Sequence, residues 1–203
     1  PRKGEREGLI HRPKHPQDMN GATVVVVGSG GREHALCLSL NASPKVAAIH
    51  CIPGNAGTAR IATNHAVESS VETLVSLFQE LEPDLVVVGP EAPLCDGLAD
   101  ACAEAGVACF GPVAALAHLE GSKLHAKQAM EAAGVPTAAY LRLDKTTDIE
   151  AALDAFSGHP WVVKRDVLAG GKGVVVSSDR DEAITFIEFS INADGYVLLE
   201  AFL

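Results

Sequence analysis

The sequence predicts an α/β protein in which a doubly wound parallel sheet precedes a smaller α+β region. Over residues 22–112, short runs of β-branched apolar residues alternate with segments of helical periodicity, as in a parallel sheet covered on both faces. Glycine-rich loops follow these runs, and they would gather at one edge of the sheet. After residue 134 the layout changes, because a glycine loop there joins two strands directly.

The first strand leads into the most informative loop. Val24–Val27 are consecutive valines, which predicts a strand buried on both faces. Residues 28–31 are glycine-rich, and a helix then runs to about Asn41. Free backbone N–H groups, the positive end of the helix dipole and the guanidinium of Arg32 all favour phosphate. Glu33 stands where a dinucleotide fingerprint needs a glycine. A phosphate-binding loop and a purely structural tight turn therefore both stay open here.

The rest of the first region repeats the order of strand, loop and helix. Ser69 and Glu72 have capping-box spacing, so they predict the start of a helix that ends before Pro83. The small-residue loop over residues 53–59 is interpreted either as a ligand loop or as a plain connection. The expected strands cover residues 45–51, 85–88 and 107–110; residues 89–94 form a loop, and residues 96–105 a helix.

The second region follows two helical segments. A glycine loop over residues 166–173 joins two of its strands, and its N–H groups, with Lys164 and Lys172, can close over phosphates. The alternative is a flexible hairpin with solvated lysines. No helix follows, so this is not a Walker loop. Expected helices cover residues 114–120, 122–133, 148–156 and 181–191, and expected strands residues 137–143, 161–164, 174–177 and 196–199.

The composition is that of a globular protein and argues against several classes of function. The formal net charge of −10 disfavours nucleic acid or an anionic membrane as a main partner. The five cysteines lack CxxC spacing, which disfavours a disulfide framework or a zinc site and favours a reducing compartment, the cytoplasm. No apolar run approaches the ~20 residues of a membrane span. Residues 1–20 are polar, and we expect a tail there.

The loops form an ordered set of motifs: GSGGREHAL (28–36), PGNAGTA (53–59), VVGPEAPL (87–94), FGP (110–112), LEGSK (119–123), VPTAAY (135–140), VVK (162–164), AGGKGVVV (169–176) and LEAFL (199–203). Together they resemble the phosphoribosylamine–glycine ligase family, also called glycinamide ribonucleotide synthetase, of the ATP-grasp superfamily. We therefore expect an N-terminal tail (1–21), a phosphoribosylamine-binding domain (22–112), a helical linker (113–134) and the small lid subdomain of an incomplete ATP-grasp region (135–203).

The resemblance implies an ATP-dependent ligase of de novo purine biosynthesis. ATP would phosphorylate the glycine carboxylate, and the amine of 5-phosphoribosylamine would displace phosphate to give glycinamide ribonucleotide. The residues implied at phosphoribosylamine are Gly28, Gly30, Gly31, Arg32, Glu33, His34, Asn55, Gly57, Thr58, Gly89, Pro90 and Glu91. Those implied at ATP are Lys123, Lys164, Gly170, Gly171, Lys172, Gly173 and Glu200, with the backbone at Ala201 and Leu203. No catalytic residue is assigned.

The chain departs from the family pattern in the glycine flap. Arg165, Val167 and Gly170 replace the family's alanine, glycine and alanine, and valine does not adopt a positive φ as readily as glycine. Residues 1–20 match nothing in the family. The groups that bind Mg²⁺ and glycine are expected beyond Leu203, as would be any fusion to further purine-pathway domains. We therefore expect the 203-residue chain alone to be inactive.

Two other interpretations stay open at this point. One is an ATP-grasp enzyme of the carboxylase type, against which the GREHAL and GNAGTA motifs count. The other is a catalytically dead module that binds a nucleotide or a phosphosugar. Binding of ATP and of a ribose 5-phosphate ligand would discriminate between them, because the ligase requires two separate sites.

Overall fold

The computed structural model describes residues 21–156, 160–168 and 172–203. The chain divides into two compact units, Pro1–Ala117 (unit 1) and His118–Leu203 (unit 2), with the boundary inside helix α5 (Ala114–Gly121). The expected tail over residues 1–20 and the flap glycines Gly170 and Gly171 lie outside the described residues. Within the described part, no helix is long and apolar enough to cross a membrane.

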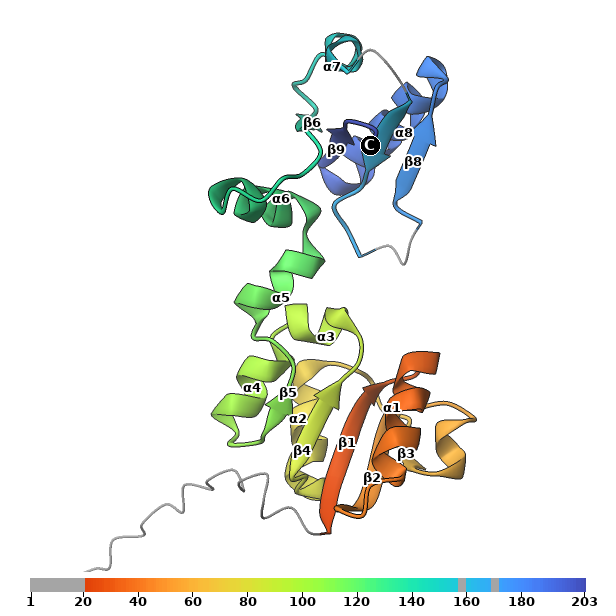
Figure 1. The fold of residues 1–203 in the computed structure, drawn as a ribbon, viewed down its shortest axis with the longest axis vertical. Helices are drawn as coiled ribbons and strands as arrows, with labels where there is room; N and C mark the ends of the chain where they lie inside the picture. The colour runs from red at the N-terminus through yellow and green to blue at the C-terminus, as the bar shows by residue number, and fades with distance from the viewer. Residues whose placement is uncertain (1–20, 157–159, 169–171) are drawn as a thin grey trace, which may run out of the picture. The chain divides into compact units, whose positions relative to one another are not determined.

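Unit 1 is built on a parallel sheet with the strand order β3-β2-β1-β4-β5 (Figure 1). The chain passes from β1 outward to β2 and β3, and then crosses to the other side of β1 for β4 and β5. This reversal between β1 and β4 is the switch point of a doubly wound sheet, which confirms the predicted fold class. The strands are β1 (Ala22–Gly28), β2 (Val46–Pro53), β3 (Thr63–Asn64), β4 (Leu85–Val88) and β5 (Cys109–Phe110).

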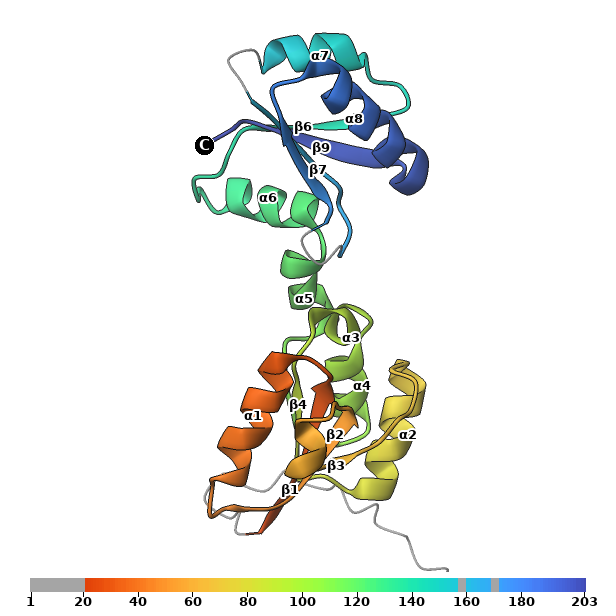
Figure 2. The ribbon, with the colours of Figure 1, turned by 90° about the vertical axis from the view of Figure 1, so that its right-hand side faces the viewer.

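Helices cover both faces of this sheet, as Figure 2 shows. The four valines of β1 explain why: Val24 and Val26 pack with residues of α1, and Val25 and Val27 pack with residues of α2 and α4. All four are at most 1% exposed, so a strand buried on both faces carries β-branched residues throughout. The helical elements of unit 1 before α5 are α1 (Gly31–Asn41), the 3₁₀ turn η1 (Thr58–Arg60), α2 (Val71–Leu81), α3 (Glu91–Cys95) and α4 (Leu98–Glu104).

Unit 1 differs from the sequence-based expectation at several element bounds; β5, for example, covers only the last two residues of the predicted strand over residues 107–110. The hydroxyl of Ser70 accepts the N–H of Thr73 at 3.3 Å and caps α2, so the predicted cap at Ser69 is wrong by one residue. The predicted loop over residues 89–94 contains most of α3. The predicted helix over residues 96–105 is α4, which starts two residues later because Gly97 (φ 92°) separates it from α3. Strand β3 is an addition that two residues of polar sequence do not signal.

Unit 2 contains a four-stranded antiparallel sheet with the order β6-β9-β7-β8. Its core lies between one face of this sheet and the helices α7 and α8, and it includes Leu143, Leu153, Trp161 and Ile187. The strands are β6 (Tyr140–Asp144), β7 (Trp161–Lys164), β8 (Val174–Ser177) and β9 (Tyr196–Glu200), and the helices are α6 (Lys123–Ala132), α7 (Ile149–Ala155) and α8 (Arg180–Asp194).

The second face of this sheet is the one that positions the candidate ATP residues. Strand pairing puts Glu200, Val162 and Val176 in one row and Leu198, Lys164 and Val174 in the next. Figure 2 shows α6 on this side, opposite α7 and α8. Val174 and Val176, which β8 contributes at the edge, are 39% and 52% exposed, so part of this apolar face is open. The strand predicted over residues 137–143 is β6, which starts later than expected because strand pairing begins at Tyr140.

Candidate functional site

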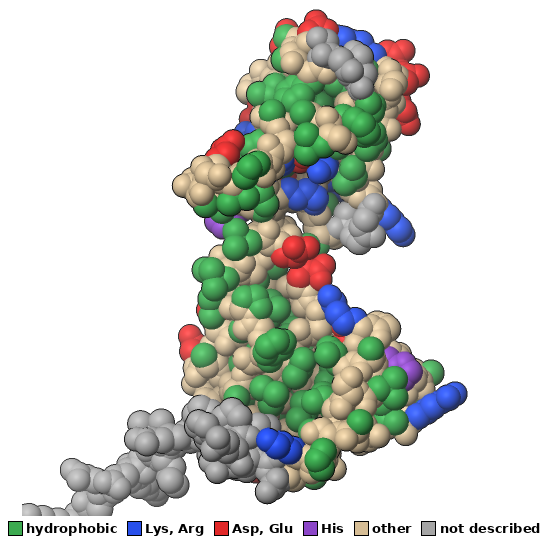
Figure 3. Space-filling model, viewed as in Figure 1, with side chains coloured by type: hydrophobic (Ala, Val, Ile, Leu, Met, Phe, Trp, Pro, Cys, Tyr) green, Lys and Arg blue, Asp and Glu red, His purple; other side chains and the backbone are tan. Residues whose placement is uncertain are grey.

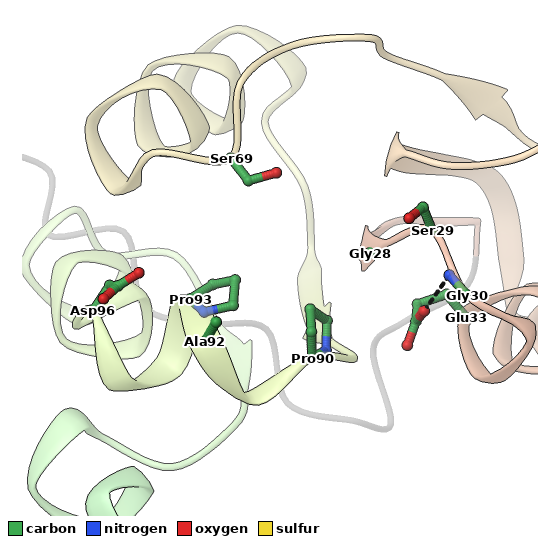
Figure 4. A pocket seen from close by; sticks show the side chains of 9 residues that line it. All are labelled: Gly28, Ser29, Gly30, Glu33, Ser69, Pro90, Ala92, Pro93 and Asp96. Atoms are coloured by element: carbon green, nitrogen blue, oxygen red, sulfur yellow. Dashed lines mark hydrogen bonds between the residues drawn. The ribbon is translucent and has the colours of Figure 1, made fainter. Parts of the chain in front are cut away.

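The first candidate site is a hollow of about 420 Å³ at the switch point of the unit 1 sheet. It lies where the loops after β1 and β4 meet, which is where open α/β sheets bind ligands. In Figure 4, Ser69 approaches from the segment before α2, opposite Ser29 and Glu33, and α3 contributes two further lining residues. The lining residues are Gly28, Ser29, Gly30, Glu33, Ser69, Pro90, Ala92, Pro93 and Asp96.

Glu33 fills the space between the two loops. Only 3% of it is exposed, and its Oε2 accepts the N–H of Gly30 at 2.6 Å. A Cβ on Gly89 would lie 2.0 Å from Glu33 Oε1, and one on Gly28 (φ 126°) would lie 2.6 Å from Glu33 Cγ. These glycines are therefore required by the close approach of the glutamate. The positive end of α1, expected to face a ligand phosphate, is in contact with the protein's own carboxylate.

Arg32 stands at the mouth of this loop. Its Nε donates to Glu33 Oε1 at 3.0 Å, while 62% of the side chain is exposed. The rest of the guanidinium fork faces solvent, where it can meet a phosphate. Gly31, the first residue of α1, has no neighbour near its missing side chain and does not line the hollow.

Asn55 ties the loop after β2 to the loop after β1. Its Nδ2 donates to the carbonyls of Ser29 (2.9 Å) and Gly30 (3.2 Å), and its Oδ1 accepts the N–H groups of Gly57 (2.7 Å) and Thr58 (3.0 Å). Thr58 is fully buried, and its hydroxyl lies 2.8 Å from Asn64 Oδ1. The polar atoms of the Asn55 and Thr58 side chains are thus engaged within the protein.

The structure gathers the predicted phosphosugar residues at one edge but gives them different surroundings. Gly28, Gly30, Glu33 and Pro90 line the hollow directly. Around them are residues that do not line it: the imidazole of His34 packs so closely on Gly57 that a Cβ there would lie 2.5 Å away. Five lining residues were not predicted from the sequence: Ser29, Ser69, Ala92, Pro93 and Asp96. Ser29 had a signal, since it belongs to the GSGGREHAL motif, and so did Ala92 and Pro93, which belong to the GPEAPL motif.

The second candidate site is in unit 2 and centres on a buried carboxylate. Glu200, on β9, is 3% exposed, and its Oε2 lies 3.0 Å from Lys164 Nζ and 3.2 Å from Lys127 Nζ. Its other oxygen, Oε1, is buried without a hydrogen-bond partner. In Figure 3 the visible face of the upper body, unit 2, carries a broad apolar area with Lys and Arg side chains at its lower rim. Cations beside an apolar surface suit a nucleotide, which pairs a planar base with phosphates.

Asp166 holds the start of α6 against the end of β7. It accepts hydrogen bonds from the hydroxyl of Ser122 (2.8 Å), from the N–H of Lys123 and from the hydroxyl of Tyr196. Burial acts to raise the pKa of Asp166, but these hydrogen bonds outweigh it, so the pKa lies below its usual value. Burial and the nearby Asp166 raise the pKa of Tyr196 to about 12. Lys123, whose Nζ donates to the carbonyl of Val167 at 3.1 Å, is thereby placed close to the strand that carries Lys164.

The flap substitutions have a structural account where the chain is described. Arg165 forms a two-pronged ion pair with Asp194 at 2.6 and 2.8 Å, and its N–H donates to the carbonyl of Gly173 at 2.8 Å. Val167 does not have a positive φ. Among the described residues, Glu82 is the non-glycine residue with a positive φ. The expected conflict at Val167 is therefore absent from this conformation. Lys172 is exposed beside the buried Gly173.

After β9, one of the backbone groups expected to bind the adenine is already engaged within the protein. The N–H of Ala201 donates to the carbonyl of Ala139 at 2.9 Å, which leaves its carbonyl for a ligand. Leu203 is 93% exposed. As for metals, the described residues contain no group of three or more His, Cys, Asp or Glu side chains that could hold one.

Comparison with protein families gives a consistent result for both units. The N-domain model of phosphoribosylglycinamide synthetase matches residues 22–120, and the ATP-grasp domain model of the same enzyme matches residues 121–203. A phosphoribosylamine–glycine ligase of Mycobacterium tuberculosis is 51% identical over 185 residues, which cover 89% of this chain and 44% of that protein. This chain thus spans less than half the length of the relative.

Solved structures agree with these matches. The crystal structure of the phosphoribosylamine–glycine ligase of Thermotoga maritima is similar with a TM-score of 0.68 at 31% identity, covering 89% of this chain and 44% of that one. An N5-carboxyaminoimidazole ribonucleotide synthetase in complex with ADP has a TM-score of 0.73 at 20% identity, covering 91% and 48%, and supports the fold alone. The motifs, the two domain matches and this likeness lead to one conclusion: the chain belongs to the phosphoribosylamine–glycine ligase family, with an ATP-grasp fold.

Proposed function

We propose that this chain supplies the phosphoribosylamine-binding and ATP-binding parts of a cytoplasmic ligase that makes glycinamide ribonucleotide. ATP phosphorylates the carboxylate of glycine, and the amine of 5-phosphoribosylamine then attacks the acyl phosphate, releasing phosphate beside the earlier ADP. The observation that carries this proposal is the presence of two separate polar sites, one in each unit, built on the family's glycine and lysine motifs. Mg²⁺ would neutralise the transferred phosphoryl group, and we assign its ligands and the glycine site to the length of the family that this chain does not span.

On the phosphosugar side, residues 22–112 provide the binding surface. The exposed part of the Arg32 guanidinium supplies the positive charge for the 5′-phosphate. Glu33, an acceptor held rigidly in the wall of the hollow, suits the hydroxyl donors of the ribose. Glycines at positions 28 and 89 leave the room that Glu33 occupies between the two loops. Residues 113–134 then link this domain to the lid subdomain, residues 135–203.

On the nucleotide side, the open apolar face of the unit 2 sheet receives the base. Lys164 stands on that face and Lys123 beside the loop that follows it, so both can contribute charge to the phosphates. Lys172 and Gly173, at the described end of the predicted flap, are further groups that we assign to the phosphates. The carbonyl of Ala201 and the backbone of Leu203 are available to the edge of the adenine.

The phosphosugar site is tested by Arg32→Ala. Removing one charge-assisted hydrogen bond should weaken ribose 5-phosphate binding by about 1.5–3 kcal/mol in calorimetry. The free energy of unfolding should change little, because the side chain is mostly exposed. Arg60→Ala, another exposed arginine of unit 1 outside the hollow, is the matched control. Equal affinities for the wild-type protein and Arg32→Ala would refute the assignment.

The nucleotide site is tested by Lys164→Gln. The variant should lose about 1.5–3 kcal/mol of affinity for ATP and much less for adenosine, because only ATP presents phosphate charge. Lys145→Gln, an exposed lysine in the turn after β6, should change neither affinity. Equal losses for ATP and adenosine would instead mark Lys164 as a structural lysine.

A further inference from the structure

Lys127, on α6, is a buried lysine that belongs to none of the motifs described above. Only 6% of the residue is exposed, and its ammonium group has three partners. Its Nζ lies 3.2 Å from Glu200 Oε2, donates to Thr137 Oγ1 at 3.1 Å and donates to the carbonyl of Ala138 at 3.0 Å. A lysine ammonium has three protons, so this one is fully engaged. These three contacts hold the Lys127 side chain in this position.

Lys164 pairs with the same carboxylate oxygen, but its side chain is more exposed to solvent. Its Nζ lies 3.0 Å from Glu200 Oε2, and 31% of its side chain is exposed. Glu200 Oε2 is the partner that the structure gives to this ammonium. Of the two lysines on Glu200, Lys164 is therefore the one that can turn toward a ligand.

The carboxylate limits that movement. Glu200 is buried, and its Oε1 has no hydrogen-bond partner, so the charge depends on the two cations at Oε2. A buried carboxylate stripped of its counter-ion is strongly unfavourable. If only one lysine stood at this place, its transfer to a phosphate would leave the carboxylate without a counter-ion. With two, one can leave while the other remains.

We propose that Lys127 is a positioning residue: the permanent counter-ion of Glu200 that releases Lys164 to bind the nucleotide phosphates. The exchange is an ion-pair transfer, in which Lys164 keeps its proton and moves from Glu200 Oε2 to a phosphate oxygen. Glu200 remains paired with Lys127 throughout. The identity of the ligand rests on the proposed function, whereas the competition between the two lysines for Glu200 does not.

The competition is measured first without any nucleotide. The 203-residue chain is pulsed with acetic anhydride, and acylation of Lys164 is read by mass spectrometry relative to the exposed Lys145. In Lys127→Met, Lys164 becomes the sole counter-ion and is held on Glu200, so its acylation should fall on the order of tenfold. In Lys127→Met/Glu200→Gln it should return to at least the wild-type level. No fall, or a fall that Glu200→Gln does not reverse, would overturn the proposal.

Calorimetry with ATP provides the second readout. Lys127→Met should bind ATP more weakly by on the order of tenfold, because Lys164 then stays on Glu200. Lys127→Arg keeps the charge and should bind ATP as the wild type does; a loss as large as that of Lys127→Met would overturn the proposal in favour of a packing role. Absence of ATP binding by the wild-type chain counts against the proposed function, and the acylation result then decides the role of Lys127 alone. If Lys127→Met does not fold, Lys127→Arg replaces it: retained charge should keep Lys164 as reactive as in the wild type, and a tenfold fall would contradict the proposal.

Discussion

Gly89→Ala tests the packing at the switch point of unit 1. A Cβ at this position would lie 2.0 Å from Glu33 Oε1 and 2.6 Å from its Cδ, distances that no real Cβ adopts. Glu33 cannot step aside freely, because its Oε2 accepts the Gly30 N–H at 2.6 Å in a buried site. Losing a charged hydrogen bond costs about 1.5–3 kcal/mol, and overpacking costs a similar amount. Some relaxation reduces the sum, and we expect a loss of about 2–4 kcal/mol in the free energy of unfolding.

Urea unfolding followed by far-UV circular dichroism measures this loss. The single tryptophan, Trp161, and both tyrosines belong to unit 2, so tryptophan fluorescence follows that unit separately. Gly31→Ala is the matched control: Gly31 is the first residue of α1, with nothing near its missing side chain, and the variant should change stability by less than about 1 kcal/mol. In a Glu33→Ala background the clash is gone, and Gly89→Ala should also become mild. A Gly89→Ala variant as stable as Gly31→Ala, or equally damaging without Glu33, would refute the reasoning.

Two further predictions concern pH and the second core. His50 Nδ1 lies 2.9 Å from His65 Nε2; burial, and then repulsion from His65, lower the pKa of His50 below 6.5, so the unfolded chain binds the proton more readily and unit 1 loses stability as the pH falls below 6.5. His50→Gln should flatten the dependence of unfolding free energy on pH between about 5 and 7, measured by circular dichroism, and an unchanged slope would contradict this. Leu153 is fully buried in the unit 2 core, and its carbonyl accepts the indole N–H of Trp161 at 3.0 Å. Leu153→Ala should lower the stability seen by tryptophan fluorescence by about 2–5 kcal/mol, with the exposed Leu141→Ala as the mild control.

Sequence reasoning located best the elements whose signal is local. Strands β7 and β8 were predicted at their observed bounds, because runs of β-branched residues stand between clear breaks. Strand β3 escaped, since it exists only through pairing of Thr63 and Asn64 with β2. Helix α3 escaped because Pro90 and Pro93 suggest a loop, although proline is tolerated where these two stand, at the cap and in the first turn.

The same distinction applies to the candidate sites: some features have a local sequence signal, and others depend on the tertiary fold. The glycine loops could be found from sequence, because a run of glycines after a strand has a backbone meaning of its own. The pairing of Lys127 with Glu200 could not, since it joins residues on α6 and β9 that meet only through the tertiary fold. Likewise, nothing local indicates that Glu33 turns back into the gap between Gly28 and Gly89.

The hydrogen bonds of Asn55 have a consequence for binding entropy. A loop rich in glycine has the largest conformational freedom to lose when a ligand orders it. Here one amide side chain clamps the carbonyls of Ser29 and Gly30, so that freedom is already lost when the chain folds. A small ligand makes few contacts, and none of their binding free energy is then needed to order the loop. Asn55→Asp would keep the acceptor toward Gly57 and Thr58 but remove both donors, returning the loop to a mobile state.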